Sequence, residues 1–260
     1  MSDIQLHYES FGEERAPPMV ILHGFLASSR NWRQIAKRLS ERFRVYVPDQ
    51  RNHGASPHAE SMDYPLMASD LETFMDRLNL ESATLLGHSM GGKTAMWFAL
   101  NFPERVSRLL VADIAPVAYQ HNFDRIIEAL DRLPLASLSN RKQADDFLSE
   151  AIPDIGFRQF LLQNLILRDG QYAWRINLDY CQQSADYIVG FPSVEGMEGF
   201  VGKVLFITGE NSTYFRPEAV PALFPNAAVA TIANAGHWLH AEQPECFVKV
   251  VEDFVMDQFK

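Results

Sequence analysis

Short apolar runs rich in β-branched residues alternate along the chain with longer stretches in which apolar residues recur every three or four positions. The short runs predict buried strands at Met19–Leu22, Phe43–Val47, Ala83–Leu86, Val106–Ile114, Val204–Thr208 and Ala228–Ile232. The longer stretches predict helices at Trp32–Leu39, Leu66–Leu78, Gly92–Leu100 and Cys246–Phe259. The segment Ile4–Ser10 alternates apolar and polar residues, which is typical of an antiparallel strand at a sheet edge. The pattern indicates an α/β fold with a mostly parallel sheet flanked by helices.

Residues 115–202 interrupt this rhythm. They contain no convincing buried strand and show helical periodicity at Phe123–Leu133, Arg141–Ile152 and Ile155–Leu167. An interval of this length is too long for a structureless loop. We therefore predict a mostly helical cap at residues 115–202, over the carboxyl edge of the sheet, and a core domain formed by residues 1–114 and 203–260.

Composition and charge narrow the classes of partner. Hydrophobic residues make up 47% of the 260 residues, which is enough to bury a sizeable core. The net charge of −10 disfavours binding to nucleic acid or to an anionic membrane surface. The N-terminal residues lack the basic and apolar regions of a secretory signal, no apolar run reaches membrane-spanning length, and two cysteines are too few for a disulfide scaffold. We expect a cytoplasmic protein whose partner is a small molecule.

The clearest chemical motif follows the predicted strand Ala83–Leu86. The segment Gly87–Gly92 reads Gly-His-Ser-Met-Gly-Gly and leads into a predicted helix. This is the G-x-S-x-G pattern in the strand–turn–helix context of a nucleophile elbow. Gly87 and Gly91 leave space for the neighbouring strand and helix in such a turn. Ser89 is therefore the predicted nucleophile.

A serine nucleophile needs a base to accept its proton. His237 follows the last predicted strand. It comes after Ser89 in the chain, and the histidine also follows the serine in folds that carry this elbow. His240 forms an H-x-x-H pair with His237, but no further ligand cluster completes a metal site. We predict that His237 is the base and that neither a metal nor another cofactor is required.

Two backbone amides are expected to bind the oxyanion of an acyl-transfer reaction. One is the amide of Met90, which follows the nucleophile and opens a helix. The other is the amide of Phe25, in the loop after the first buried strand. His23 in the same loop is expected to order it by hydrogen bonding.

The chain resembles the α/β-hydrolase superfamily in His23-Gly24-Phe25, the Asp49–Ser56 loop, the Gly87–Gly92 elbow and Gly236-His237-Trp238. It is most similar to the bacterial YbfF-type esterases, in Arg51-Asn52-His53-Gly54, Gly87–Lys93 and Ala112-Asp113-Ile114-Ala115-Pro116. The resemblance implies an α/β-hydrolase fold with the cap inserted after the sixth strand. It also implies a serine carboxylesterase for short acyl esters, with acyl-CoA thioesters as a second substrate class. The Asp49–Ser56 loop is expected to be structural, and Lys93 to serve in packing or an ion pair.

The acid of the triad has two candidates. Many superfamily members carry it after the strand that ends here at Gly209, but this chain has Ser212 at that position. Asp113 stands at the end of an earlier strand, where the YbfF-type resemblance also points. We predict Asp113 as the acid and retain Glu210 as the alternative.

The leading prediction is a serine esterase with His23, Tyr119 and Trp238 as substrate-binding side chains. Bulky cap residues are expected to roof the pocket or to pack within the cap, namely Tyr119, Phe123, Phe160, Trp174 and Tyr187. Two alternatives remain open, a lyase of menaquinone synthesis with the same fold and a small-molecule sensor that binds without turnover. Ser212 disfavours the lyase, because those enzymes resemble the pattern with the later acid.

Overall fold

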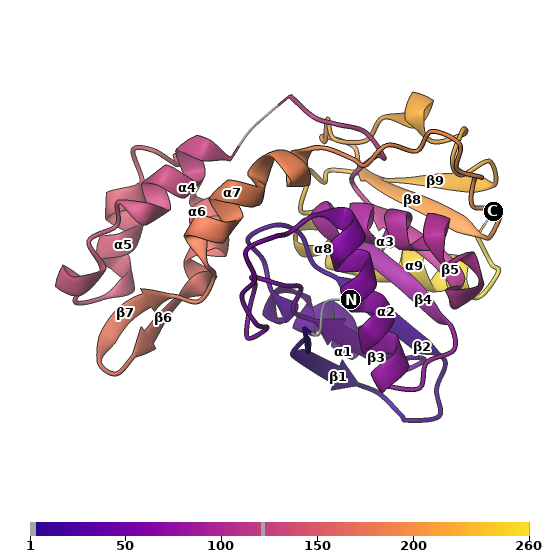
Figure 1. Cartoon of the computed structure of the whole chain (residues 1–260), viewed down its shortest axis with the longest axis horizontal. Helices are drawn as coiled ribbons and strands as arrows, with labels where there is room; N and C mark the ends of the chain where they lie inside the picture. Colours follow the sequence, from indigo (N-terminus) through magenta and orange to yellow (C-terminus); the bar gives the residue numbers. More distant parts are fainter. Residues whose placement is uncertain (1–3, 121–122, 260) are drawn as a thin grey trace.

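The computed structural model describes residues 4–120 and 123–259, and its central element is a seven-stranded sheet (Figure 1). The strand order is β1-β3-β2-β4-β5-β8-β9, and β1 is antiparallel to β3 while the other neighbouring pairs are parallel. The strands are β1 (Tyr8–Phe11), β2 (Pro18–Leu22), β3 (Arg44–Pro48), β4 (Ala83–His88), β5 (Val106–Ala112), β8 (Val204–Gly209) and β9 (Ala227–Ile232). The α/β prediction and the antiparallel edge strand are confirmed, although β1 begins four residues later than expected.

Helices cover both faces of the sheet because successive strand residues point to opposite sides. Leu85 packs with α2 (Tyr64–Arg77) and α3 (Met90–Asn101), whereas Leu86 packs on the opposite face with α1 (Arg33–Leu39) and α9 (Pro244–Val255). A short helix, α8 (Leu239–Glu242), precedes α9. The helices predicted in the core are confirmed, but α9 ends at Val255 rather than Phe259.

The cap contains α4 (Asp124–Asp131), α5 (Arg141–Leu148), α6 (Ile155–Leu161), β6 (Leu165–Arg168), β7 (Gln171–Trp174) and α7 (Leu178–Val189). The antiparallel pair β6–β7 corrects the prediction that helical structure continues to Leu167. Its turn is Asp169-Gly170, in which both residues have positive φ, 52° and 80°. Asp-Gly between short strands is a strong hairpin signal, and it was present in the sequence.

The position of the cap in the strand order also differs from the expectation. The cap follows β5, the fifth strand of the described chain, rather than a sixth strand. The reason is that the described N-terminal segment contributes a single antiparallel strand, β1, before β2.

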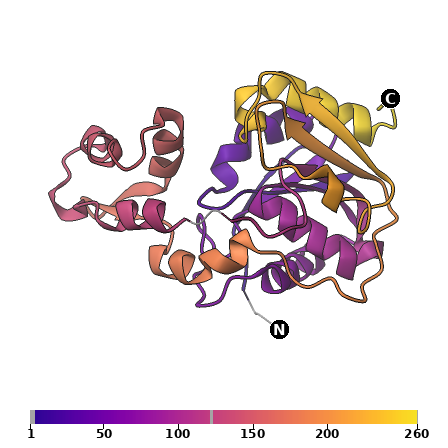
Figure 2. The ribbon, with the colours of Figure 1, turned by 90° about the horizontal axis from the view of Figure 1, so that it is seen from above.

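The cap stands to one side of the sheet and packs on the loops at the carboxyl ends of its strands (Figures 1 and 2). The Tyr64 hydroxyl donates to the carbonyl of Ile188 at 2.5 Å, and the Asn164 side chain donates to the carbonyl of Leu26 at 2.7 Å. Phe25, Leu26 and Met90 share an apolar cluster with the cap helices. The carboxyl edge is where open α/β sheets bind ligands, so the cap covers the expected site. In the described residues, no helix combines the length and apolar character needed to span a membrane.

Candidate active site

Ser89 lies in the turn between β4 and α3, with φ 52° and ψ −119°. A non-glycine residue rarely adopts positive φ, and such strain is typical of functional turns. A Cβ on Gly87 would lie 2.2 Å from the carbonyl oxygen of Gly91, and a Cβ on Gly91 would lie 2.2 Å from that of Leu22. The turn therefore requires both glycines, as the motif predicts, and it places Ser89 at the carboxyl edge of the sheet.

Asp113 and His237 come together beside this turn. Asp113 follows β5, its side chain is fully buried, and its Oδ2 lies 2.8 Å from Nδ1 of His237. The other carboxylate oxygen, Oδ1, accepts hydrogen bonds from the Thr208 hydroxyl at 3.1 Å and the Gly209 amide at 3.2 Å. These donors offset the desolvation of a buried carboxylate. The carboxylate is thus fixed where it can orient the His237 ring.

The alternative acid, Glu210, makes no hydrogen bond to His237 among the described residues. Its carboxylate instead accepts a hydrogen bond at 2.8 Å from the backbone amide of Asn234, three residues before His237 in the loop after β9. Ser212 donates a hydrogen bond to Oδ2 of Asp113. Ser212, at the position where many relatives carry the acid, therefore hydrogen-bonds to Asp113, the candidate acid that follows β5. We did not predict this role from the sequence.

The His237 ring is held on one face by Tyr214. The ring centroids are 4.0 Å apart and the planes are inclined by 24°, a stacked arrangement that the sequence did not reveal. Ser89 is half-buried and lines the same pocket as His237. In the described part of the chain its hydroxyl has no hydrogen-bond partner. The hydrogen bond between a nucleophile and its base is often long or absent without substrate. The lack of a hydrogen bond between Ser89 and His237 therefore agrees with general-base chemistry.

The two candidate oxyanion amides have no internal acceptor. Among residues 4–120 and 123–259, neither the Phe25 amide nor the Met90 amide donates a hydrogen bond. The next amide along, that of Leu26, donates to Nε2 of His53 at 3.1 Å. Met90 also opens α3, where the helix dipole favours negative charge. Both amides are available to a developing oxyanion.

His23, which we predicted as a substrate-binding side chain, does not reach the pocket over Ser89. Its side chain is fully buried and it is not among the described residues that line the pocket. Its Nδ1 bonds the Gly24 carbonyl at 2.8 Å, and its Nε2 accepts from the Gln50 amide at 2.9 Å. Burial lowers the pKa of His23, which keeps the ring neutral and suited to this donor–acceptor pair. The residue orders the oxyanion loop, the other role expected for it.

The Asp49–Ser56 loop is structural, as expected. Asn52 and Gly54 have positive φ, and the Asp49 carboxylate accepts from the Ser29 amide at 2.6 Å and the Ala55 amide at 2.9 Å. A Cβ on Gly54 would fall 2.0 Å from the Asp49 carboxyl carbon. This loop therefore braces the site from outside the pocket.

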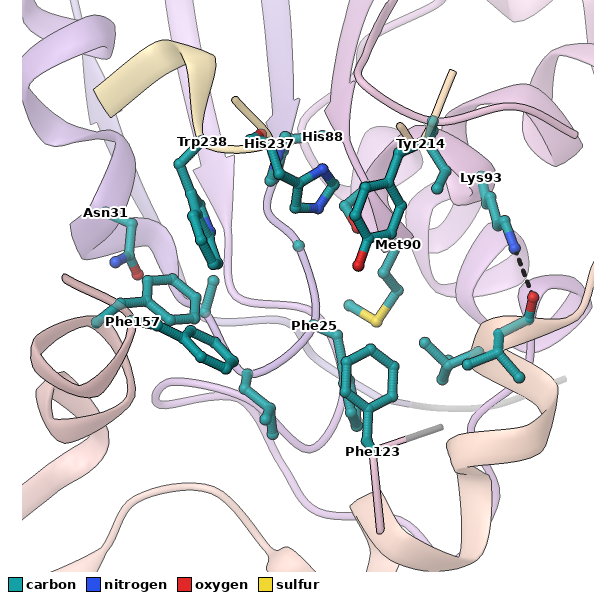
Figure 3. A pocket seen from close by; sticks show the side chains of 18 of the residues that line it. Phe25, Asn31, His88, Met90, Lys93, Phe123, Phe157, Tyr214, His237 and Trp238 are labelled. Atoms are coloured by element: carbon teal, nitrogen blue, oxygen red, sulfur yellow. Dashed lines mark hydrogen bonds between the residues drawn. The ribbon is translucent and has the colours of Figure 1, made fainter. Parts of the chain in front are cut away.

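A pocket of about 450 Å³ opens over Ser89 between the core and the cap (Figure 3). Tyr119 and Trp238 line it, as predicted for substrate-binding side chains. Figure 3 shows Trp238 on the same side as Phe157, and the ring centroids of the two are 5.2 Å apart. The walls are largely apolar and include Phe25, Leu26, Trp32, Met90, Ile114, Phe123, Ile126, Phe160, Ile188, Val189 and Tyr214.

The bulky cap residues divide between three environments. Tyr119, Phe123 and Phe160 line the pocket. Trp174 instead donates to the Leu130 carbonyl at 3.1 Å and packs within the cap. Tyr187 is 64% exposed, so the prediction that it packs in the cap or the pocket is wrong.

Lys93 connects the elbow helix to the cap. Its side chain is buried, and Nζ donates to the carbonyls of Val189 at 2.9 Å and Gly190 at 2.6 Å, at the end of α7 (Figure 3). It also lies 4.7 Å from the centre of the Tyr119 ring. Within the described residues no carboxylate pairs with it, so the packing role is confirmed and the ion pair is wrong. Burial lowers the pKa of Lys93 from 10.5 to about 7.

This buried amine predicts a pH-dependent stability. Between pH 7 and pH 10.5 the unfolded chain binds a proton at Lys93 that the folded chain mostly lacks, so stability rises with pH in this window. We expect the free energy of unfolding of the wild type to gain about 3 kcal/mol relative to Lys93→Met between pH 7 and about pH 9.5. Urea unfolding of both proteins at both pH values measures the gain. If the free energies of unfolding of the two proteins differ by the same amount at both pH values, the lowered pKa of Lys93 is contradicted.

The described residues do not form a recognisable metal-binding site. No group of three or more His, Cys, Asp or Glu side chains is placed there to hold a metal ion. His240, the second histidine of the H-x-x-H pair, stacks on Trp32 with centroids 4.1 Å apart and planes 7° apart. Its position is explained by packing.

Comparison with known proteins places this geometry in a family. Residues 17–244 match the model of the α/β hydrolase fold. The chain is 39% identical over 257 residues to the sn-1-specific diacylglycerol lipase ABHD11 of Mus musculus, covering 94% of this chain and 82% of that protein. It is 34% identical over 245 residues to esterase YbfF of Escherichia coli (strain K12), covering 92% and 93%, which bears out the YbfF-type resemblance.

Solved structures agree with these sequence matches. The structure of a marine microorganism esterase superposes with a TM-score of 0.92 at 40% identity, covering 97% of this chain and 100% of that one. The family match includes the elbow, Asp113 and His237. The chain belongs to the α/β hydrolase fold family.

Proposed function

We propose that this protein is a serine carboxylesterase that hydrolyses short-chain acyl esters through an acyl-enzyme on Ser89. The observation that carries the proposal is the 2.8 Å contact between His237 Nδ1 and Asp113 Oδ2 at the pocket into which the Ser89 turn opens. Relatives named as an esterase and as a lipase support ester hydrolysis as the class of reaction. The largely apolar walls of the pocket suit an acyl group, and the amides of Phe25 and Met90, which have no acceptor in the described chain, would supply the oxyanion site.

The reaction proceeds in two halves. The Ser89 oxygen attacks the ester carbonyl carbon while Nε2 of His237 accepts the hydroxyl proton, and Asp113 stabilises the resulting imidazolium. The amides of Phe25 and Met90 bind the oxyanion of the tetrahedral intermediate. The C–O bond to the alcohol then breaks and His237 returns the proton to the leaving oxygen. Water repeats the sequence on the acyl-enzyme and releases the carboxylic acid and Ser89.

Turnover separates this proposal from the sensor alternative. An esterase incubated with a large excess of p-nitrophenyl butyrate releases many equivalents of p-nitrophenol, whereas a sensor stops after about one. Sustained release is the expected result. A single equivalent, with the acyl group retained on the protein, would contradict the proposal. The Asp113–His237 pair disfavours the lyase, because those enzymes resemble the pattern with an acid at the position of Ser212.

The pocket volume predicts a preference for short acyl chains. A volume of about 450 Å³ lies toward the lower end of the range for ligand pockets, about 300–1,000 Å³. Each buried methylene contributes about 0.8 kcal/mol until the chain meets the aromatic roof. We expect kcat/KM to rise over the first few carbons, so that acetyl to hexanoyl esters are preferred over dodecanoyl and longer esters.

A panel of p-nitrophenyl esters and acyl-CoA thioesters from two to sixteen carbons tests this preference. Comparison at equal chain length also decides between oxygen esters and thioesters. A steady increase in kcat/KM up to the palmitoyl substrates would contradict the short-chain specificity.

A further inference from the structure

His88, the residue between Gly87 and Ser89, is buried and contributes a hydrogen bond that the triad chemistry does not use. Its Nε2 lies 2.8 Å from the backbone carbonyl oxygen of His237. Because a carbonyl oxygen only accepts hydrogen bonds, Nε2 carries the proton and donates it. The other ring nitrogen, Nδ1, is therefore unprotonated in the neutral ring. One end of the nucleophile turn is thus bonded directly to the backbone of the base.

The ring of His88 also contacts the oxyanion loop. A Cβ added to Gly24 would lie 3.0 Å from Nδ1 of His88 and 3.4 Å from Cβ of Ser89. On its other side, the ring centroid is 4.7 Å from that of His237. The imidazole therefore separates the loop that supplies the Phe25 amide from the loop that supplies the base.

Besides the stacking of Tyr214 on its ring, His237 is held by two hydrogen bonds of different kinds. Asp113 holds Nδ1 of the ring, which fixes the tautomer and the direction of the ring. His88 holds the backbone carbonyl, which fixes where the loop stands relative to Ser89. A ring held by Asp113 and Tyr214, with no bond to the loop backbone from the Ser89 turn, could shift together with its loop. A displacement of about 1 Å between reacting groups costs on the order of 100-fold in rate.

We propose that His88 is a positioning residue for ester hydrolysis, which donates from Nε2 to the His237 carbonyl and so sets the distance between the base loop and the Ser89 turn. The inference rests on the proposed function. It assigns no proton transfer to His88, since the one proton of its ring is held by the carbonyl.

The environment keeps this donor in one state. Burial lowers the pKa of His88 well below its ordinary value, with the nearby His237 and His240 as further causes. A second proton on the ring is therefore disfavoured at neutral pH. The ring also lies 4.7 Å from His240 and 6.3 Å from Trp32, centroid to centroid, and these contacts restrict its rotation.

A matched pair of substitutions separates the hydrogen bond from the volume of the ring. The amide nitrogen of His88→Gln occupies about the place of the imidazole Nε2 and can donate to the same carbonyl, whereas His88→Met has a similar volume and no donor. We expect His88→Met to lower kcat for p-nitrophenyl butyrate about 10- to 100-fold with KM changed less than about 3-fold. His88→Gln is expected to restore kcat to within about 5-fold of the wild type.

Two further measurements exclude a general loss of structure. Urea unfolding checks that both variants fold, and proton NMR checks that the downfield Nδ1 proton of His237 persists in His88→Met, since the Asp113 contact is unchanged. If His88→Met does not fold, His88→Phe, which retains an aromatic ring without the donor, is compared with His88→Gln in the same way.

Equal kcat values for the donor-free and Gln variants would overturn the positioning role. Failure of the proposed function is distinguishable, because the wild type itself would then show neither turnover nor acylation.

Discussion

Replacement of Ser89 by alanine is expected to lower kcat for p-nitrophenyl butyrate by about 10⁴- to 10⁶-fold. The elbow presents the Ser89 oxygen at the pocket, and no second hydroxyl is held in the same strained turn between β4 and α3 in the described chain. Removal of the oxygen leaves only the oxyanion amides and binding to accelerate attack by water. Labelling by a fluorophosphonate probe, which reacts with an activated serine, should disappear together with turnover.

The matched control is Ser107→Ala. Ser107 is exposed at the opposite end of β5, where its hydroxyl contacts Thr84 at 3.2 Å. It should retain full turnover and full labelling. Labelling that survives in Ser89→Ala at the wild-type rate would place the nucleophile at another residue and contradict the proposed mechanism.

Asp113→Asn is expected to lower kcat by about 10²- to 10⁴-fold while the protein remains folded. An asparagine cannot stabilise the imidazolium of His237, and its amide group can hold the ring in the wrong tautomer. The change also replaces a carboxylate that accepts from Thr208, Gly209 and Ser212. Steady-state kinetics together with urea unfolding separates the loss of catalysis from any loss of stability.

Glu210→Gln is the control for this assignment. Glu210 lies two residues before Ser212 and, among the described residues, its side chain accepts only from the Asn234 amide in the loop after β9. It should cost less than about 10-fold in kcat. A larger loss for Glu210→Gln than for Asp113→Asn would show that the acid is misassigned, while leaving ester hydrolysis itself in place.

Most of the core could be predicted from the sequence because its strands and helices have strong local patterns. The β-branched runs marked every parallel strand of the sheet, and the three- and four-residue spacing marked α2, α3 and α9. The cap was harder. The pattern predicts helix through most of β6, because the apolar residues of this strand continue the spacing of α6. The prediction does not include α7, although its buried residues recur at helical spacing. Short segments are the ones for which periodicity discriminates least.

The sequence by itself determined the elbow, the candidate nucleophile and the chain order of the triad candidates, because each depends on a few consecutive residues with restricted backbone geometry. Only the tertiary structure showed that Asp113, and not Glu210, is hydrogen-bonded to His237 in the described chain. It also showed that the side chain of His23 is buried and that Ser212, Tyr214 and His88 lie at the site. The partners in these contacts are separated along the chain by up to about 150 residues. They meet because β5 and β8 are neighbours in the sheet and their loops share one edge, a relation that no local pattern encodes.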